Sequence, residues 1–316
     1  MPTIRDALQD NRLPRLETRM LLAHALGHAR PAHAHAWLLA RDTEALPADA
    51  AERFTESLRT TGFGVLTNHP IPKELVQSIY DNWYRFFMSE QKQAFLFNRE
   101  TQDGYFPPSV SEVAKGNTQK DIKEYFHLYP WGQMPEELRT QAMEYYRLAN
   151  DLAAELLSWV EQYTPADIAA HYSCPLSSMI EESQKTLLRV LHYPPFDGTE
   201  EPGAIRAAAH EDINLLTILP AASEPGLQVK GSDGEWMDVP CDFGTLIINI
   251  GDMLQEASHG YYPSTTHRVI NPTGGSAAKS RISLPLFLHP RPDVVLSERH
   301  TAHSYLMERL RELGVI

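Results

Sequence analysis

The stretch from residue 227 to residue 250 reads LQVKGSDGEWMDVPCDFGTLIINI and decides how the second half of the chain folds. Two apolar runs, 227–229 and 236–239, flank the turn Gly231-Ser-Asp-Gly234, which is typical of a β-hairpin. A third run, 245–250, has the length of a strand. Further short strands are expected at 186–193, 267–270 and 281–288. Many short strands without intervening helices favour a sandwich or barrel over a parallel sheet.

The first half of the chain predicts helices instead. Apolar residues recur at spacings of three and four over 48–61, 72–95 and 135–163, which indicates amphipathic helices. Gly62 follows the first of these and suits a left-handed C-terminal cap. One short strand is expected at 63–68, and a last helix at about 301–313. The sequence therefore predicts an α+β protein, with helices first and an all-β core after them.

Composition narrows the classes of partner. The 316 residues include 28 basic and 41 acidic side chains, so the net charge is −13. This charge argues against a nucleic-acid or anionic-membrane surface, which needs a concentrated positive face. The sequence has no run of 18 apolar residues, its N-terminus does not resemble a secretory signal, and two cysteines are too few for a disulfide framework. We expect a cytoplasmic protein in a reducing setting, and nothing in the residues favours one oligomeric state.

Three residues suggest a metal site. His210 and Asp212 are two apart, so on an extended strand or at its end their side chains point to the same face. His267, from another strand, would complete a set of two imidazoles and one carboxylate, which leaves about three positions of an octahedral metal open. The chain has fourteen histidines, so this pattern also arises by chance. Taken alone, it leaves metal binding open.

A second group suggests a carboxylate site. Arg281 and Ser283 share one face of a predicted strand, and a guanidinium beside a hydroxyl grips a carboxylate through charge-assisted hydrogen bonds. Tyr193, at the end of an earlier strand, offers one more hydroxyl. A surface strand arginine and a half-buried core tyrosine are the simpler interpretations of these residues. His192 neighbours Tyr193 but should point to the opposite face, so it is not counted as a ligand.

The order of these motifs resembles a known family, the isopenicillin N synthase-like non-haem iron(II), 2-oxoglutarate-dependent dioxygenases. The resemblance covers about residues 54–300. It is carried by Leu191-His-Tyr193-Pro-Pro, AHEDINLLTIL (209–219), Gly226-Leu-Gln-Val229, Gly251-Asp-Met-Leu-Gln255, Ser264-Thr-Thr-His267-Arg-Val269 and Arg281-Ile-Ser283-Leu-Pro285.

The resemblance implies a double-stranded β-helix, a distorted jelly roll, flanked by helices. It implies Fe(II) held by His210, Asp212 and His267, which would be both the metal ligands and the catalytic centre. It further implies that Arg281 and Ser283 hold the distal carboxylate of 2-oxoglutarate, with help from Tyr193. With O2, such an enzyme hydroxylates or desaturates a small molecule and releases succinate and CO2.

Three other functions stay open at this point. One is an oxidase like isopenicillin N synthase, in which the Arg-x-Ser pair would hold the carboxylate of the substrate and 2-oxoglutarate is not used. Another is an ethylene- and succinate-forming enzyme, in which 2-oxoglutarate itself is fragmented. A third, of a different class, is a binding module without catalysis.

The N-terminal residues 1–53 differ from the rest. They are neutral, rich in alanine and free of lysine. Through the run from Leu13 to Gly27 and the run from Ala36 to Ala40, they resemble the helical N-terminal domain of release-factor glutamine methyltransferases, although the chain lacks that family's catalytic core. We therefore expect a helical segment at 1–53 that packs weakly against the remainder, and a dioxygenase domain at 54–316. The latter divides into a mainly helical half (54–184), the β core (185–300) and a C-terminal helix (301–316).

Overall fold

The computed structural model describes residues 49–110, 120–196, 200, 203–222, 224–272, 279–312 and 314. Most of the N-terminal segment lies outside these residues, so its helical fold, its weak packing and the boundary at residue 53 stay predictions. The first described helix, α4 (Ala50–Thr61), ends at Gly62, whose φ of 73° is the left-handed cap expected from the sequence. Ala50 and Phe54 of this helix are both buried in the core.

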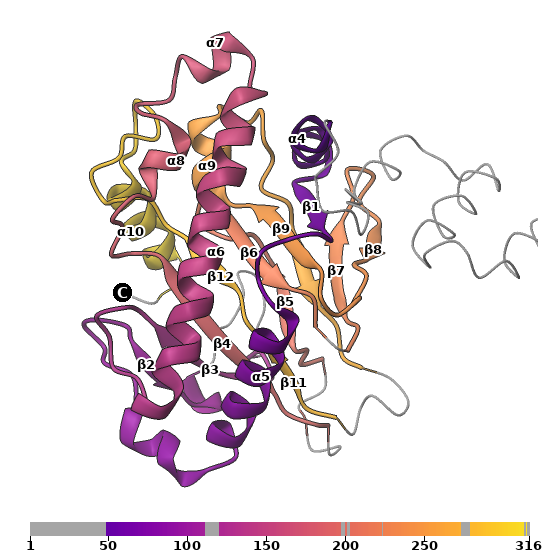
Figure 1. Ribbon diagram of the computed structural model, residues 1–316, viewed down its shortest axis with the longest axis vertical. Coiled ribbons are helices and arrows are strands. Elements are labelled where there is room, and N and C mark those ends of the chain that lie inside the picture. Colours follow the sequence, from indigo (N-terminus) through magenta and orange to yellow (C-terminus); the bar gives the residue numbers. More distant parts are fainter. Residues whose placement is uncertain are drawn as a thin grey trace, which may run out of the picture.

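Two antiparallel sheets form the centre of the described chain (Figure 1). The larger sheet has eight strands, in the order β1 (Phe63–Leu66), β9 (Leu246–Ile250), β6 (Leu216–Pro220), β12 (Leu286–Leu288), β4 (Leu187–Tyr193), β3 (Glu124–Leu128) and β2 (Gly104–Phe106), with β11 (Arg281–Ser283) also pairing with β4. The smaller sheet has the order β5 (Ala207–His210), β10 (His267–Val269), β7 (Leu227–Lys230) and β8 (Trp236–Asp238).

The two sheets pack on one another through an apolar layer. Phe63 and Ile247 of the larger sheet share a buried cluster with Val229, Val269 and Ala207 of the smaller sheet. Facing antiparallel sheets with their cores interdigitated are the expected architecture of a sandwich. The α+β class and the jelly-roll core that the sequence predicts are confirmed.

Helices cover the outer face of the larger sheet. The long helix α6 (Glu136–Gln162) crosses that face beside α5 (Lys73–Phe87), as Figure 1 shows. Shorter helices surround them: η1 (Glu90–Phe95), η2 (Pro108–Val110), α7 (Ala166–Ala169), α8 (Leu176–Met179), α9 (Asp252–Ala257) and α10 (Ala302–Glu312). Among the described residues, none of the helices is both long and apolar enough to cross a bilayer.

The structure departs from the sequence prediction at several elements. The helix expected at 72–95 ends at Phe87 and continues as a 3-10 helix, and the strand expected at 281–288 is interrupted at Pro285. A proline lacks the N–H that a sheet ladder needs, which explains the second break. Strand β3 was not foreseen, and α9 lies between β9 and β10 where a direct connection was expected.

The side chains of β4 point alternately to the helical face of the larger sheet and to its inner face. Leu188 and Val190 belong to the core beneath the helices, whereas Leu191 and Tyr193 belong to a separate cluster on the opposite face. In the register between β11 and β4, Arg281 lies opposite Tyr193, and Ser283 lies opposite Leu191. Cross-strand partners point to the same side of a sheet. Both residues of the Arg-x-Ser pair therefore face the smaller sheet.

We predict that Gly251→Ala destabilises the protein and disturbs the loop after β5. A Cβ at this position would lie 2.1 Å from the backbone oxygen of Asn214, and the next residue, Asp252, donates its N–H to the Asp212 carbonyl at 2.7 Å. Overpacking of this kind costs about 1–3 kcal/mol in the free energy of unfolding. The measurement is denaturant unfolding. The matched control is Gly231→Ala, where the close neighbour of the added Cβ is the movable Asp233 carboxylate and the Glu235 carbonyl and Met237 lie at ordinary contact distance. An equal loss in both variants would contradict the prediction.

Candidate active site

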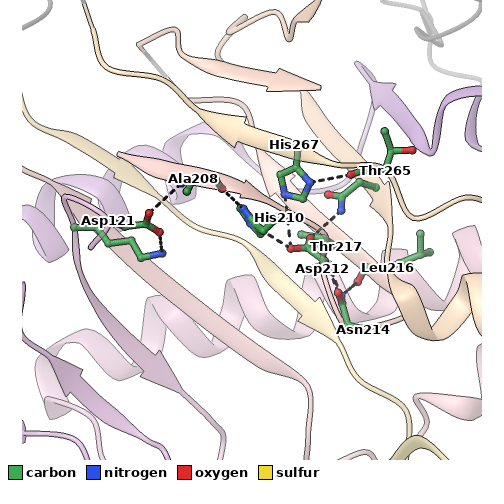
Figure 2. Close-up of polar contacts among 11 residues, drawn as sticks. Asp121, Ala208, His210, Asp212, Asn214, Leu216, Thr217, Thr265 and His267 are labelled. Carbon is green, nitrogen blue, oxygen red and sulfur yellow. Dashed lines mark hydrogen bonds and ion pairs between the residues drawn. The ribbon is translucent and has the colours of Figure 1, made fainter. Parts of the chain in front are cut away.

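Two histidines that are distant in the sequence face each other across neighbouring strands. The register between β5 and β10 places His210 opposite His267, and their ring centres lie 4.4 Å apart (Figure 2). The same pairing is irregular further along, since Ala207 lies opposite Val269. Such a bulge gives β5 one more residue than β10 and re-aims its side chains. Residues far apart in the chain thus reach one site through strand pairing alone.

Asp212 completes this group from the segment that follows β5. Its Oδ1 lies 3.9 Å from His210 Nε2 and 3.7 Å from His267 Nε2. The potential ligand atoms of the three residues lie within 4.8 Å of one another. Among the described residues, this is the group of His, Cys, Asp and Glu side chains that could hold a metal ion. The three residues singled out in the sequence are therefore brought together.

The carboxylate is held in place by two strands of the larger sheet. Its second oxygen, Oδ2, accepts a hydrogen bond from the Thr217 hydroxyl at 2.5 Å and one from Asn249 Nδ2 at 2.8 Å (Figure 2). Thr217 and Asn249 are register partners on β6 and β9. Because Oδ2 is occupied by these donors, Oδ1 is left facing the two histidines.

Backbone carbonyls fix the orientation of both rings. His210 Nδ1 lies 2.7 Å from the carbonyl oxygen of Ala208, and His267 Nδ1 lies 3.1 Å from that of Thr265. A carbonyl oxygen only accepts, so each Nδ1 carries the proton and each Nε2 presents a lone pair. This is the usual arrangement of metal-binding histidines, whose outer nitrogen is oriented by a hydrogen bond.

The protonation states also suit a metal. Loss of hydration and the neighbouring His267 lower the pKa of His210, so its ring is neutral near pH 7. Burial alone would raise the pKa of Asp212, but the two histidines and the donors Asn249 and Thr217 outweigh it and hold the pKa below its usual value. Two neutral imidazoles and an ionised carboxylate are the forms in which these side chains bind metals.

Arg281, the first residue of the Arg-x-Ser pair, lines a small hollow between the sheets. Leu219 and Ile247 line the hollow together with Arg281. Leu219 on β6 and Ile247 on β9 are register partners. Each lies two residues from the pair Thr217 and Asn249, which is about 7 Å along a strand. The hollow therefore lies along the same pair of strands, β6 and β9, that holds the Asp212 carboxylate.

Arg281 is suited to bind an anion there. Its side chain is only 4% exposed, yet Nε and Nη1 have no hydrogen-bond partner among the described residues. Its guanidinium carbon lies 5.2 Å from the centre of the Tyr193 ring. A buried, unpaired guanidinium is costly unless a ligand supplies the missing acceptors. Ser283 is also buried and follows on the same face of β11, so the guanidinium and the hydroxyl fit one end of a dicarboxylate. The two imidazoles and the carboxylate of the histidine–aspartate group fit Fe(II).

Two residues that shape the site, Thr217 and Asn249, were not predicted from the sequence. Each is a buried polar residue within an otherwise apolar strand, and that contrast was the available signal. His192 was excluded as a ligand, and the structure agrees. Its ring stacks on Phe87 on the helical side of the sheet and bonds to Glu124.

Comparison with known families agrees with this geometry. Residues 185–290 match the sequence profile of the 2OG-Fe(II) oxygenase superfamily, and residues 38–151 match the N-terminal profile described as non-haem dioxygenase in morphine synthesis. The chain belongs to the 2OG-Fe(II) oxygenase superfamily. It is an Fe(II)- and 2-oxoglutarate-dependent oxidoreductase of the isopenicillin N synthase-like group that the sequence motifs resembled.

Solved and curated relatives support this membership. The oxygenase is 67% identical to a Shewanella oneidensis protein described as an oxygenase, with a TM-score of 0.78 over 85% of this chain and 97% of the other. A Caulobacter crescentus protein of the 2OG-Fe(II) oxygenase family is 28% identical, with a TM-score of 0.70 over 83% of this chain and 93% of the other. The 2-oxoglutarate-Fe(II) type oxidoreductase hxnY of Emericella nidulans is 28% identical, covering 79% of this chain and 77% of the relative.

We predict that Thr217→Val weakens metal binding in this oxygenase. The substitution keeps the shape of the side chain but removes the hydroxyl that orients the Asp212 carboxylate. Loss of a hydrogen bond to a ligand typically lowers metal affinity about tenfold or more. Titration with Fe(II) under anaerobic conditions measures the change. Thr245→Val is the control, since the Thr245 hydroxyl donates to the Asp242 carbonyl, outside the site. Equal affinities of Thr217→Val and the unchanged protein would contradict the prediction.

Proposed function

We propose that the oxygenase hydroxylates or desaturates a small molecule while 2-oxoglutarate is converted to succinate and CO2. In this proposal His210, Asp212 and His267 ligate Fe(II), and Arg281 with Ser283 receives the distal carboxylate of 2-oxoglutarate. Two observations together carry it: three ligand atoms converge, and the buried guanidinium of Arg281 has two nitrogens without a hydrogen-bond partner among the described residues.

The three ligands leave room for the reaction. Two imidazoles and a carboxylate occupy about three of six positions around an octahedral metal, so the 2-oxo acid and O2 have places to bind. Iron held by these residues would supply the oxidising chemistry, with one oxygen atom of O2 ending in succinate and the other in the new hydroxyl group or, in a desaturation, in water.

The side chains of the chain itself supply position and charge. The Thr217 and Asn249 donors keep Asp212 ionised and aimed at the histidines. On the same side of the larger sheet, Arg281 is fixed by its register with Tyr193, so the distal carboxylate would be received at a defined distance from the metal. Tyr193 adds its ring and a hydroxyl beside that guanidinium.

Anaerobic spectroscopy tests this function directly. Adding 2-oxoglutarate to the Fe(II)-loaded protein should produce a weak visible charge-transfer band, and admitting O2 should then yield succinate. His267→Ala should lose most metal affinity and all turnover because it removes one of the three ligands. Full activity in this variant would overturn the ligand assignment. Oxidation of a substrate without any 2-oxoglutarate would replace the proposal with an isopenicillin N synthase-like oxidase.

The carboxylate assignment gives a second prediction. Arg281→Ala should raise the 2-oxoglutarate concentration needed for half-saturation by roughly 30-fold or more, since truncating one partner of a buried charge pair costs about 2–5 kcal/mol. Titration of the charge-transfer band measures the change. Arg147→Ala is the control, because the Arg147 guanidinium lies on the surface of α6 and pairs with Asp151. An unchanged half-saturation point in Arg281→Ala would show that another residue receives the carboxylate.

A further inference from the structure

A second buried arginine lies beside Arg281. Arg206 is 1% exposed, and its guanidinium carbon lies 5.8 Å from the centre of the Tyr193 ring, the same ring that Arg281 approaches to 5.2 Å. It also lies 5.7 Å from the Phe196 ring. The two arginines come from different sheets, because Arg206 directly precedes β5 and Arg281 begins β11. Tyr193 is thus shared by two guanidinium groups.

The protein satisfies Arg206 only in part. Its Nη2 donates to the carbonyl oxygen of Lys279 at 3.0 Å, but its buried Nε has no hydrogen-bond partner within the described part of the chain. The negative charge of Glu224 acts to raise the pKa of Arg206, but the Glu224 carboxylate forms its ion pair with Lys279 Nζ, at 2.8 Å. With Nε and Nη1 of Arg281, three buried guanidinium nitrogens therefore lack acceptors.

The backbone around Arg206 is well anchored. Its own N–H donates to Asn271 Oδ1 at 3.0 Å, and Asn271 Nδ2 donates to the Ala204 carbonyl at 2.8 Å. The next residues form β5, which carries His210. Arg206 therefore precedes His210 by four residues of the chain, and its backbone is held by Asn271 just before β5 begins.

The two cations destabilise one another. Burial and the charge of Arg281 lower the pKa of Arg206 to about 10, so it still carries its charge near pH 7. Like charges in a poorly solvated site repel strongly, and an anion bound beside them removes both the repulsion and the missing hydrogen bonds. The pair is therefore better suited to a carboxylate-bearing ligand than either arginine alone.

We propose that Arg206 is a second receptor for the distal carboxylate of 2-oxoglutarate, acting with Arg281 across the Tyr193 ring. The inference rests on the proposed function, in which Arg281 binds that carboxylate. It assigns to Arg206 a role in selecting a dicarboxylate over a 2-oxo acid that ends in a methyl group. The simpler alternative is that Arg206 only holds the Lys279 carbonyl and packs on the aromatic rings.

The test compares two ligands on the anaerobic Fe(II)-loaded protein. One is 2-oxoglutarate, and the other is 2-oxopentanoate, which chelates iron in the same way but has a methyl group in place of the distal carboxylate. Arg206→Gln keeps a donor for the Lys279 carbonyl and removes the charge. It should lower the preference for 2-oxoglutarate over 2-oxopentanoate by about tenfold or more, the worth of a charge-assisted hydrogen bond. Binding is measured by calorimetry or by the charge-transfer band.

Two further variants keep the test decisive. Arg206→Met, which keeps the apolar stem, is measured in the same way with the same expectation, so the result does not depend on one variant folding. Arg268→Met is the matched control, because that guanidinium also lies over an aromatic ring, 3.9 Å from the centre of Trp236, and its neighbour Gln228 is outside the site. Its ligand preference should equal that of the unchanged protein.

The outcomes separate the two proposals. A ligand preference in folded Arg206→Gln and Arg206→Met equal to that of the unchanged protein overturns the role of Arg206, because a structural arginine would affect both ligands alike. If Arg281→Ala loses the preference in the same experiment, the proposed function still stands. If the unchanged protein shows no preference for 2-oxoglutarate, both the function and the inference are overturned.

Discussion

The pairing of β5 with β10 is the constraint on which the site depends. It alone brings His210 opposite His267, and Asp212 follows two residues after the end of β5 at His210. The Asp212 carboxylate then reaches the larger sheet through Thr217 and Asn249. One side chain therefore connects both sheets, so the packing of the sandwich and the geometry of the three ligands are set together. A shift of either sheet would separate Asp212 from its donors or from the histidines.

Charge is distributed unevenly around the candidate site. At one end the buried, ionised carboxylate of Asp212 faces two imidazole rings, an arrangement that favours a cation. At the other end Arg281 and Arg206 present guanidinium nitrogens without acceptors, which favours an anion. A ligand that carries negative charge at both ends and chelates through one of them, as 2-oxoglutarate does, would complement both. The metal and the cosubstrate would thereby offset the unfavourable free energy of burying charged groups without partners.

The sequence was sufficient where structure follows from local pattern or from an ordered set of motifs. The hairpin turn, the cap at Gly62 and the three convergent ligands were all predictable. Strand β3 was not, because all five of its residues are buried and its sequence has no alternation of polar and apolar residues. Arg206 was not singled out, because an arginine before a strand is ordinarily a surface residue. Only the tertiary packing places it beside Tyr193.

The position of Arg281 illustrates why pairing matters more than chain connection. The segment that leads from His267 to Arg281 does not set the register of β11, because that register is fixed by β4, where Arg281 lies opposite Tyr193. The helical side of the sheet reinforces it: His192 Nε2 lies 3.1 Å from the Ser280 hydroxyl, and His192 Nδ1 lies 2.7 Å from Glu124 Oε1. Ser280 directly precedes Arg281, so this buried polar chain holds the start of β11. A connection of different length can therefore be accommodated without moving the guanidinium, because the pairing of β11 with β4 determines where it lies.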